Sequence, residues 1–317
     1  MRLPILMYHY VRPNQERLSA KHKVLELSKF TAQIEELQKK YSFIIGKYLS
    51  SDRDDDFKSK IWLTFDDGYR DCIDYVLPTL LKLGAVGTFY VPTEAVYERK
   101  LLDVNKIHVL LSSGISEIDL LETTKRIFDT LKINEKIGQS FEELYKVNGI
   151  ANAWNSKETE FLKKIFQKLL PIESRKALLD QVFCQIVDRK ESSWVDEFYL
   201  TPDDVQRLSE SGMEIGSHGH SHEWLSEMTA NQQRSDLVKS FSILKSELSG
   251  HDVESVCYPF GSYDFQTLEI LRENKIKTAV VHKSQQFAEV TQDGTNMLEL
   301  DRIDIMFFDR FMRGDFS

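Results

Sequence analysis

Residues 61–68 have the sequence IWLTFDDG. A short run that is mostly apolar, at residues 61–65, is typical of a buried strand, and this one ends directly at Asp66 and Asp67. Gly68 then permits a backbone conformation that other residues rarely adopt. Because adjacent side chains of an extended chain diverge, one carboxylate can bind a metal while the other faces a substrate. The run therefore predicts a strand end that carries a catalytic pair, and the alternative is a solvated acidic turn.

Three histidines follow a second strand-like run, MEIGS at residues 213–217. His218 and His222 are four residues apart and share one face of a helical turn, whereas an extended chain would also place His220 on their side. Two carboxylates and two or three imidazoles on neighbouring strand ends would form a divalent-metal site with a spare carboxylate for proton transfer. The alternative is a cluster of surface histidines.

The composition is that of a globular protein with an acidic surface. The chain has 317 residues, 41% of them hydrophobic, and a net charge of −9, which disfavours nucleic acid and anionic membranes as partners. No segment approaches the roughly 20 apolar residues of a membrane helix. The N-terminus reads as a strand rather than a signal peptide, and three widely spaced cysteines indicate a reducing compartment. We therefore expect a cytoplasmic location.

Strand and helix patterns alternate at both ends of the chain, which predicts an α/β fold with parallel strands. Strands are expected at residues 3–9, 61–65, 86–91, 213–215, 255–258, 278–281 and 303–307. Helices are expected from Ser28, at residues 71–83, after Thr201, along the stripe Leu237 to Leu248, and at residues 265–274.

The alternation is interrupted at about residues 98–199, where apolar residues recur at helical spacing, as in Ile118, Leu121, Ile127 and Leu131. We interpret this stretch as a helical insertion within a single catalytic domain that spans residues 1–317. It either covers the strand ends as a lid or packs far from the chemistry.

Four motifs together resemble the polysaccharide deacetylase family, carbohydrate esterase family 4. They are TFDDG at 64–68, SHGHSH at 217–222, ILMYH at 5–9 and CYPFG at 257–261, and the Met-Tyr-His segment resembles one subgroup. The resemblance covers roughly residues 1–97 and 200–310. It implies a distorted (β/α) barrel with fewer than eight strands and metal-dependent hydrolysis of N-acetyl groups on an amino-sugar glycan or glycan precursor.

The resemblance also implies roles for individual residues. Asp67, His218 and His222 would bind the metal, and Asp66 would be the general base that activates the attacking water. His220 has no role as a ligand in the family. The ligand set suits zinc, although cobalt, nickel or iron also fits two histidines and a carboxylate.

A general acid is expected from one of two histidines. Many members of the family use a histidine near the C-terminus in a Leu-x-His context, and the nearest candidate here is His282. The subgroup with an N-terminal Met-Tyr-His segment supplies it from the first strand instead, as His9. We favour His9, and the alternative is that His9 only caps the strand end.

The third motif departs from the family pattern. The family has an arginine two residues before the proline, where this chain has Cys257, so the base lacks its usual partner. Arg302 would supply the charge from the last strand, or else form a surface ion pair. Tyr258, Pro259 and Phe260 form the expected substrate and oxyanion loop, with the Phe260 N–H as donor. Aromatic residues considered for sugar stacking are Trp62, Tyr69, Tyr258 and Phe260, with core packing the better interpretation of Trp62.

Two rival functions remain open. Since a fold does not fix its substrate, the chain could be an amide hydrolase acting on a non-sugar amide. It could also be a noncatalytic carbohydrate-binding protein, but the presence of Asp66 beside Asp67 argues against this, because binding needs no base.

Overall fold

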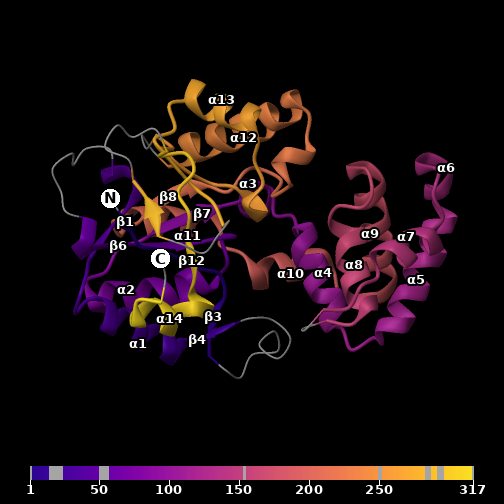
Figure 1. Ribbon diagram of the computed structural model, residues 1–317, viewed down its shortest axis with the longest axis horizontal. Coiled ribbons are helices and arrows are strands. Elements are labelled where there is room, and N and C mark those ends of the chain that lie inside the picture. The colour runs from indigo at the N-terminus through magenta and orange to yellow at the C-terminus, as the bar shows by residue number, and fades with distance from the viewer. Residues whose placement is uncertain are drawn as a thin grey trace. The chain divides into compact units, whose positions relative to one another are not determined.

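The computed structural model describes residues 2–13, 24–49, 57–152, 155–248, 252–282, 287–290 and 296–315. The chain divides into two compact units, Met1–Lys100 with Val195–Ser317 and, separately, Leu101–Trp194. The first unit contains the α/β alternation and the second is helical (Figure 1). A single catalytic domain with an insertion at about 98–199 stays a prediction.

One parallel sheet forms the centre of the first unit. Along its path lie β10 (Thr278–Val280), β9 (Ser255–Cys257), β8 (Glu214–Ser217), β7 (Thr88–Val91), β6 (Lys60–Phe65), β2 (Ile5–Tyr8) and β12 (Ile303–Asp304). Every neighbouring pair along this path is parallel. Beside the path, β5 (Ser42–Ile44) pairs with β6.

The two ends of this path approach each other through the segment before β12. Leu300 forms a parallel bridge with Val280 of β10, whereas Ile303 and Asp304 pair with β2. The sheet therefore curls, and the unit is a distorted (β/α) barrel, the fold class expected from the sequence.

The central strands are buried on both faces, as parallel strands covered by helices are. The rings of Tyr8, Phe65 and Phe89 stack across β2, β6 and β7, with centroids 5.1 and 4.7 Å apart. These residues are register partners, Tyr8 with Phe65 and Phe65 with Phe89. Because β2 and β6 both end at this level, the polar residues that follow these two strands lie at the same edge of the sheet.

Helices alternate with strands along much of the first unit (Figure 1). They are α1 (Leu27–Leu37), α2 (Leu77–Leu83), α3 (Thr93–Tyr97), α11 (Pro202–Glu210), α12 (Ala230–Glu247), α13 (Phe265–Glu273) and α14 (Phe308–Arg313). The start of α11 is the predicted one: Thr201 and Asp204 cap it reciprocally, with Pro202 in the first turn. A π-helical turn at Cys72–Val76 precedes α2, which ends at Gly84 with φ 64°.

Some short elements were not predicted or differ from the prediction. β1 (Arg2–Leu3) pairs antiparallel with β11 (Ala288–Glu289), and β3 (Val11–Arg12) pairs parallel with β4 (Leu25–Glu26). The strand expected at 303–307 is only two residues long. It stops because the Asp304 carboxylate accepts from Met306 N at 2.9 Å and caps a 3-10 turn at Ile305–Phe307.

The second unit is helical, as its spacing predicts. It contains α4 (Asp103–Ser112), α5 (Glu117–Thr130), α6 (Ile133–Ile137), α7 (Phe141–Asn148), α8 (Lys157–Gln167), α9 (Ile172–Ile186) and the start of α10 (Glu191–Phe198). Phe128, Phe141 and Phe161 pack edge to face in its core. The expected face of α5 was partly wrong: Ile118 is 61% exposed, and Leu120 is buried instead.

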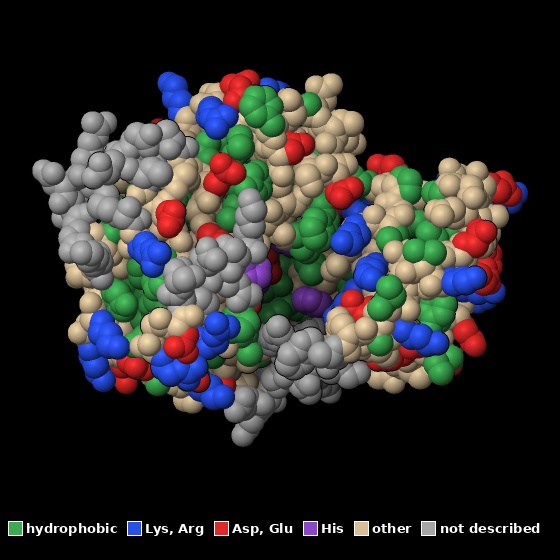
Figure 2. All heavy atoms as spheres, in the orientation of Figure 1, with side chains coloured by type: hydrophobic (Ala, Val, Ile, Leu, Met, Phe, Trp, Pro, Cys, Tyr) green, Lys and Arg blue, Asp and Glu red, His purple; other side chains and the backbone are tan. Residues whose placement is uncertain are grey.

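The visible surface mixes charges of both signs. Figure 2 shows Lys and Arg side chains interspersed with Asp and Glu over the face it displays.

Cys72, Cys184 and Cys257 are free thiols, and the first and last are buried. Within the described ranges, no helix is both long and apolar enough to cross a bilayer.

Candidate metal centre

The residues singled out in the sequence follow the carboxyl ends of neighbouring parallel strands. His9 follows β2, Asp66 and Asp67 follow β6, and His218 follows β8, while Cys257 is the last residue of β9. The carboxyl ends of parallel strands meet at one edge of a sheet, which is where ligands bind in α/β folds. The topology thus brings together residues that lie about 150 positions apart in the chain.

Asp67 lies against two imidazoles. Its Oδ1 is 3.3 Å from His218 Nε2 and 3.1 Å from His222 Nε2. All three side chains are buried, with residue exposures of 6%, 3% and 8%. The imidazole rings meet edge to face, with centroids 4.7 Å apart. The predicted trio therefore converges on one point.

Unusual backbone conformations produce this convergence. Asp67 and His222 have φ values of 71° and 55°, in the left-handed region, and Gly68 and Gly219 lie there too. Asp and His are among the residues that enter this region more often than most. The chain therefore turns sharply after β6 and in the histidine loop (residues 218–222), and both turns aim side chains at the same place.

Hydrogen bonding and charge both prepare the trio for a cation. His218 Nδ1 is 2.8 Å from the Cys257 carbonyl oxygen, so Nδ1–H donates there and Nε2 is left facing Asp67. Burial raises the pKa of Asp67, but the hydrogen bonds from His218 and His222 hold it well below its usual value. Burial lowers the pKa of His218, but the surrounding groups, Cys257 and Asp67 among them, raise it well above its usual value. The ionised Asp67 carboxylate thus holds a proton on the His218 imidazole, and a metal ion that binds here would displace it.

The donor set fits a divalent metal. Ligands about 2.0–2.1 Å from a tetrahedral zinc ion lie about 3.3 Å from each other, and the two Asp67 separations, 3.1 and 3.3 Å, match this spacing. Two imidazoles and a carboxylate with a hydrogen-bonded outer shell form the ligand type of catalytic sites, which keep a position for water or substrate.

Among the described residues, two other groups of three side chains also have donor atoms close enough together to share a metal ion. They are Asp66 with His218 and Cys257, and Glu94 with Glu98 and His220. In the first, Asp66 is bound to an arginine and burial raises the pKa of the Cys257 thiol. In the second, Lys100 lies 2.7 Å from Glu94 and Lys239 lies 2.6 Å from Glu98. Asp67, His218 and His222 therefore make the better cation site.

Asp66 points to a different partner, Arg302. The guanidinium donates from Nη1 to Oδ1 and from Nη2 to Oδ2, both at 2.8 Å. It also donates to Thr64 Oγ1 and to the Val281 carbonyl, and Nη2 is 3.1 Å from Cys257 Sγ. Burial raises the pKa of Asp66, but Arg302 brings it below its usual value. Arg302 is 2% exposed, so the alternative of a surface ion pair was wrong.

Within the described part of the chain, His9 is the histidine that forms an ion pair with Asp66. Its Nε2 is 3.9 Å from Asp66 Oδ2, and its side chain is 41% exposed whereas that of Asp66 is 3% exposed. His282 follows β10 and is exposed to solvent. His9 is thus placed where it can contact both a substrate and the base, and its role as the acid stays a prediction.

The expected oxyanion loop forms a tight turn beside the histidines. In the turn Pro259–Gly261, Phe260 has φ 57°, and its ring packs against the His222 ring with centroids 4.8 Å apart. Trp224, which belongs to none of the four sequence motifs, stacks on Phe260 with ring centroids 4.5 Å apart and an interplanar angle of 5°. Both rings are partly buried and form an apolar wall next to His222.

Other aromatic candidates are occupied by packing. Tyr258 stacks on Tyr263 and donates to the Leu298 carbonyl at 2.8 Å, so any contact of Tyr258 with a substrate comes from its backbone. Trp62 is fully buried and donates to Thr88, as its core interpretation predicts. Tyr69 is 1% exposed, stacked on Tyr10, and offers no surface for a sugar ring. The loop formed by Pro259 and Phe260 is therefore the predicted substrate contact that lies at the site.

Comparisons with known proteins agree with this geometry. A family model described as polysaccharide deacetylase matches residues 53–120 and 176–279. Among curated proteins, none matches the chain. The residues that the family model matches include the carboxylates after β6, the histidine loop and the turn after β9.

Solved structures share the fold at low sequence identity. The Streptococcus pyogenes deacetylase PplD in complex with acetate is 18% identical with a TM-score of 0.59, and the match covers 99% of this chain and 97% of that one. IcaB from Ammonifex degensii is 14% identical with a TM-score of 0.58, covering 98% and 96%. A de-N-acetylase from Aggregatibacter actinomycetemcomitans is 11% identical with a TM-score of 0.52, covering 96% and 94%.

Proposed function

The chain belongs to the polysaccharide deacetylase family, and we propose that it is a metal-dependent hydrolase that removes N-acetyl groups from an amino-sugar-containing glycan or glycan precursor. The observation that carries the proposal is the division of labour between adjacent carboxylates. Asp67 faces His218 and His222, while Asp66 faces Arg302. One carboxylate is thus available as a ligand and the other as a base.

Asp67, His218 and His222 would hold the cation, which we propose to be zinc. When bound, a divalent cation polarises a carbonyl group and makes water more acidic. Asp66 accepts the proton of the attacking water, because its carboxylate is kept ionised by Arg302 despite burial. Arg302 touches no reacting atom in this scheme and acts by orienting Asp66.

His9 donates the proton to the departing amine. Its exposed side chain can reach a substrate at the strand ends, and its Nε2 lies 3.9 Å from Asp66 Oδ2. Proton transfer by a positioned histidine typically contributes about 10²–10⁴-fold to a rate. The reaction breaks the amide C–N bond and leaves a free amino sugar and acetate.

The turn after β9 contributes binding and charge stabilisation. The backbone N–H of Phe260 is the donor proposed for the developing oxyanion. The stacked rings of Phe260 and Trp224 give an apolar surface beside His222, against which an acetyl methyl group or a sugar face can pack. The related Streptococcus pyogenes deacetylase was solved in complex with acetate, which is the product expected here.

Acetate release from a panel of substrates tests the proposal. The purified chain, loaded with zinc, should release acetate from N-acetylated amino-sugar oligomers but not from non-sugar amides. Asp66→Asn should abolish release while zinc content stays at the wild-type value, because Asp67 remains. Release only from non-sugar amides would favour the rival hydrolase, and glycan binding without turnover would favour the noncatalytic alternative.

A further inference from the structure

The histidine loop is attached to the barrel by a buried carboxylate that none of the roles above uses. Asp236 of α12 is 8% exposed. Its Oδ2 accepts from His220 N at 2.8 Å, and its Oδ1 accepts from Ser221 N at 2.9 Å and from Ser221 Oγ at 2.5 Å. These residues lie between the two proposed histidine ligands.

The opposite side of the loop is held by the first turn of α3. Thr93 N donates to the Gly219 carbonyl at 3.3 Å, and Glu94 N donates to the His220 carbonyl at 2.9 Å. Thr93 Oγ1 is also 2.9 Å from His220 Nδ1. His220 is therefore engaged by α3 through its ring and by Asp236 through its backbone, and it is not needed as a ligand.

The loop requires such support because its backbone conformation is unusual. His222 has φ 55°, in a region that L side chains rarely adopt, whereas Gly219, with φ 71°, enters the same region without this cost. A Cβ at Gly219 would lie 3.0 Å from Asp236 Oδ2, so the loop closes directly over the carboxylate. Such a conformation persists only when the surrounding contacts determine it.

We infer that Asp236 is a positioning residue that presets His218 and His222 for the metal. The inference rests on the proposed function, because it takes these histidines as ligands. If the loop is ordered before the metal binds, binding does not have to supply the free energy of ordering it. Loss of Asp236 should therefore weaken metal affinity. Outer partners of metal ligands typically change affinity by about 10–100-fold when they are replaced.

Asparagine at position 236 is the sharpest test. A carboxylate only accepts hydrogen bonds, and both oxygens of Asp236 accept from a backbone N–H. An asparagine side chain must therefore place its NH₂ group against one of these N–H donors. Asp236→Asn keeps the size of the side chain and breaks at least one of the two backbone contacts.

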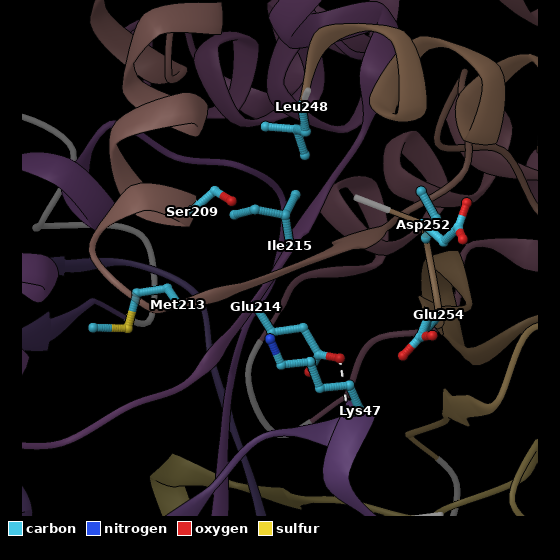
Figure 3. Close-up of a pocket in the computed structure, with 9 residues that line it drawn as sticks. Lys47, Ser209, Met213, Glu214, Ile215, Leu248, Asp252 and Glu254 are labelled. Atoms are coloured by element: carbon cyan, nitrogen blue, oxygen red, sulfur yellow. Dashed lines mark hydrogen bonds between the residues drawn. The ribbon is translucent and has the colours of Figure 1, made fainter. Parts of the chain in front are cut away.

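Glu214 offers a matched control at the other end of β8. This carboxylate is 6% exposed and accepts from Gly46 N at 2.7 Å and from Lys47 N at 2.9 Å. Figure 3 shows Glu214 beside Lys47 in the pocket that both residues line. Glu214 is the first residue of β8, whereas the histidine loop follows the last. Glu214→Gln makes the same chemical change to a carboxylate that holds two backbone amides.

Zinc affinity is measured on the metal-free proteins by competition with a chromophoric chelator, together with the melting temperature of each metal-free protein. Asp236→Asn should bind zinc about 10–100-fold more weakly than the wild type. Glu214→Gln should lose stability but keep the wild-type affinity. Wild-type affinity in Asp236→Asn, or an equal loss in Glu214→Gln, overturns the inference while leaving the proposed function intact.

Two further outcomes are informative. If Asp236→Asn does not fold, Ser221→Ala removes only the hydroxyl contact and should weaken zinc binding about threefold, and unchanged affinity overturns the inference. A wild-type chain that binds no zinc overturns both the metal-dependent function and this inference.

Discussion

Replacing Arg302 with methionine removes the charge that faces Asp66 and keeps an unbranched side chain. Both members of this pair are almost fully buried, with side-chain exposures of 2% and 3%. Removing one partner of a buried ion pair costs about 3–5 kcal/mol, because the other charge stays buried and unpaired. With about 2–4 °C lost per kcal/mol in a protein unit of this size, the melting temperature should fall by about 10 °C.

The same substitution should shift the pH dependence of turnover. In the wild type, burial raises the pKa of Asp66, but Arg302 lowers it by more. The base is therefore ionised at pH values from below its usual pKa upward. Without Arg302 the effect of burial dominates and the pKa of Asp66 rises. Each unit of pKa above the assay pH costs about tenfold in ionised base. The acid limb of kcat/KM should move to higher pH, with activity recovering as the pH is raised.

Arg12→Met is the control for lost stability alone. Arg12 forms a second buried pair with Asp71, at 2.8 and 2.9 Å, with both side chains 4% exposed. Arg12→Met should destabilise the protein about as much as Arg302→Met and leave the acid limb of kcat/KM at its wild-type pH. Acetate release is measured across pH at saturating zinc, with calorimetry for stability. If the pH profile of Arg302→Met superimposes on that of the wild type, or if the profile of Arg12→Met is shifted equally, Arg302 does not keep Asp66 ionised for catalysis.

Four further substitutions have defined outcomes. His9→Gln should lower kcat/KM by about 10²–10⁴-fold and His282→Gln should leave it near the wild-type value, and the reverse ranking in acetate release would make His282 the acid. Hydrogen bonds from Lys239 and Lys100 lower the pKa of Glu98 to about 2, so its stabilisation is present above its usual pKa and is lost as the pH falls toward 2. Because the Glu98 side chain is 31% exposed, solvent screening limits this stabilisation to about 1 kcal/mol. Thermal melts of Glu98→Gln should therefore show a loss of stability that shrinks as the pH is lowered. A loss of stability that does not change with pH would contradict this. Thr201→Ala removes the cap of α11 and should cost about 1 kcal/mol in chemical unfolding with turnover unchanged, whereas unchanged stability would show that the cap contributes little.

The sequence predicts those features of the fold that depend on local pattern. Strongly apolar runs such as residues 61–65 are strands, and the Thr201 cap begins a helix where expected. Features that do not show in the apolar pattern were not predicted. The strand at Ile303 ends after two residues because a side-chain cap redirects the chain, and Ile118 faces solvent although it fits the helical spacing.

The site shows the same limit. Motif residues that adjoin strand ends, such as Asp67 and His218, could be identified because parallel topology brings strand ends together. The fit of Arg302 between Thr64, Asp66 and Val281 depends on how the last strand closes the barrel, which no local pattern encodes. Trp224 and Asp236 carry no motif of their own, although Trp224 lies only two residues after His222.

Anomalous scattering at the zinc edge, from crystals grown with zinc, shows directly whether Asp67, His218 and His222 bind one metal ion. We expect one ion with Asp67, His218 Nε2 and His222 Nε2 at about 2.0–2.2 Å, and Asp66 still paired with Arg302. An ion bound instead between Asp66 and Cys257, or no ordered ion at saturating zinc, would contradict this expectation.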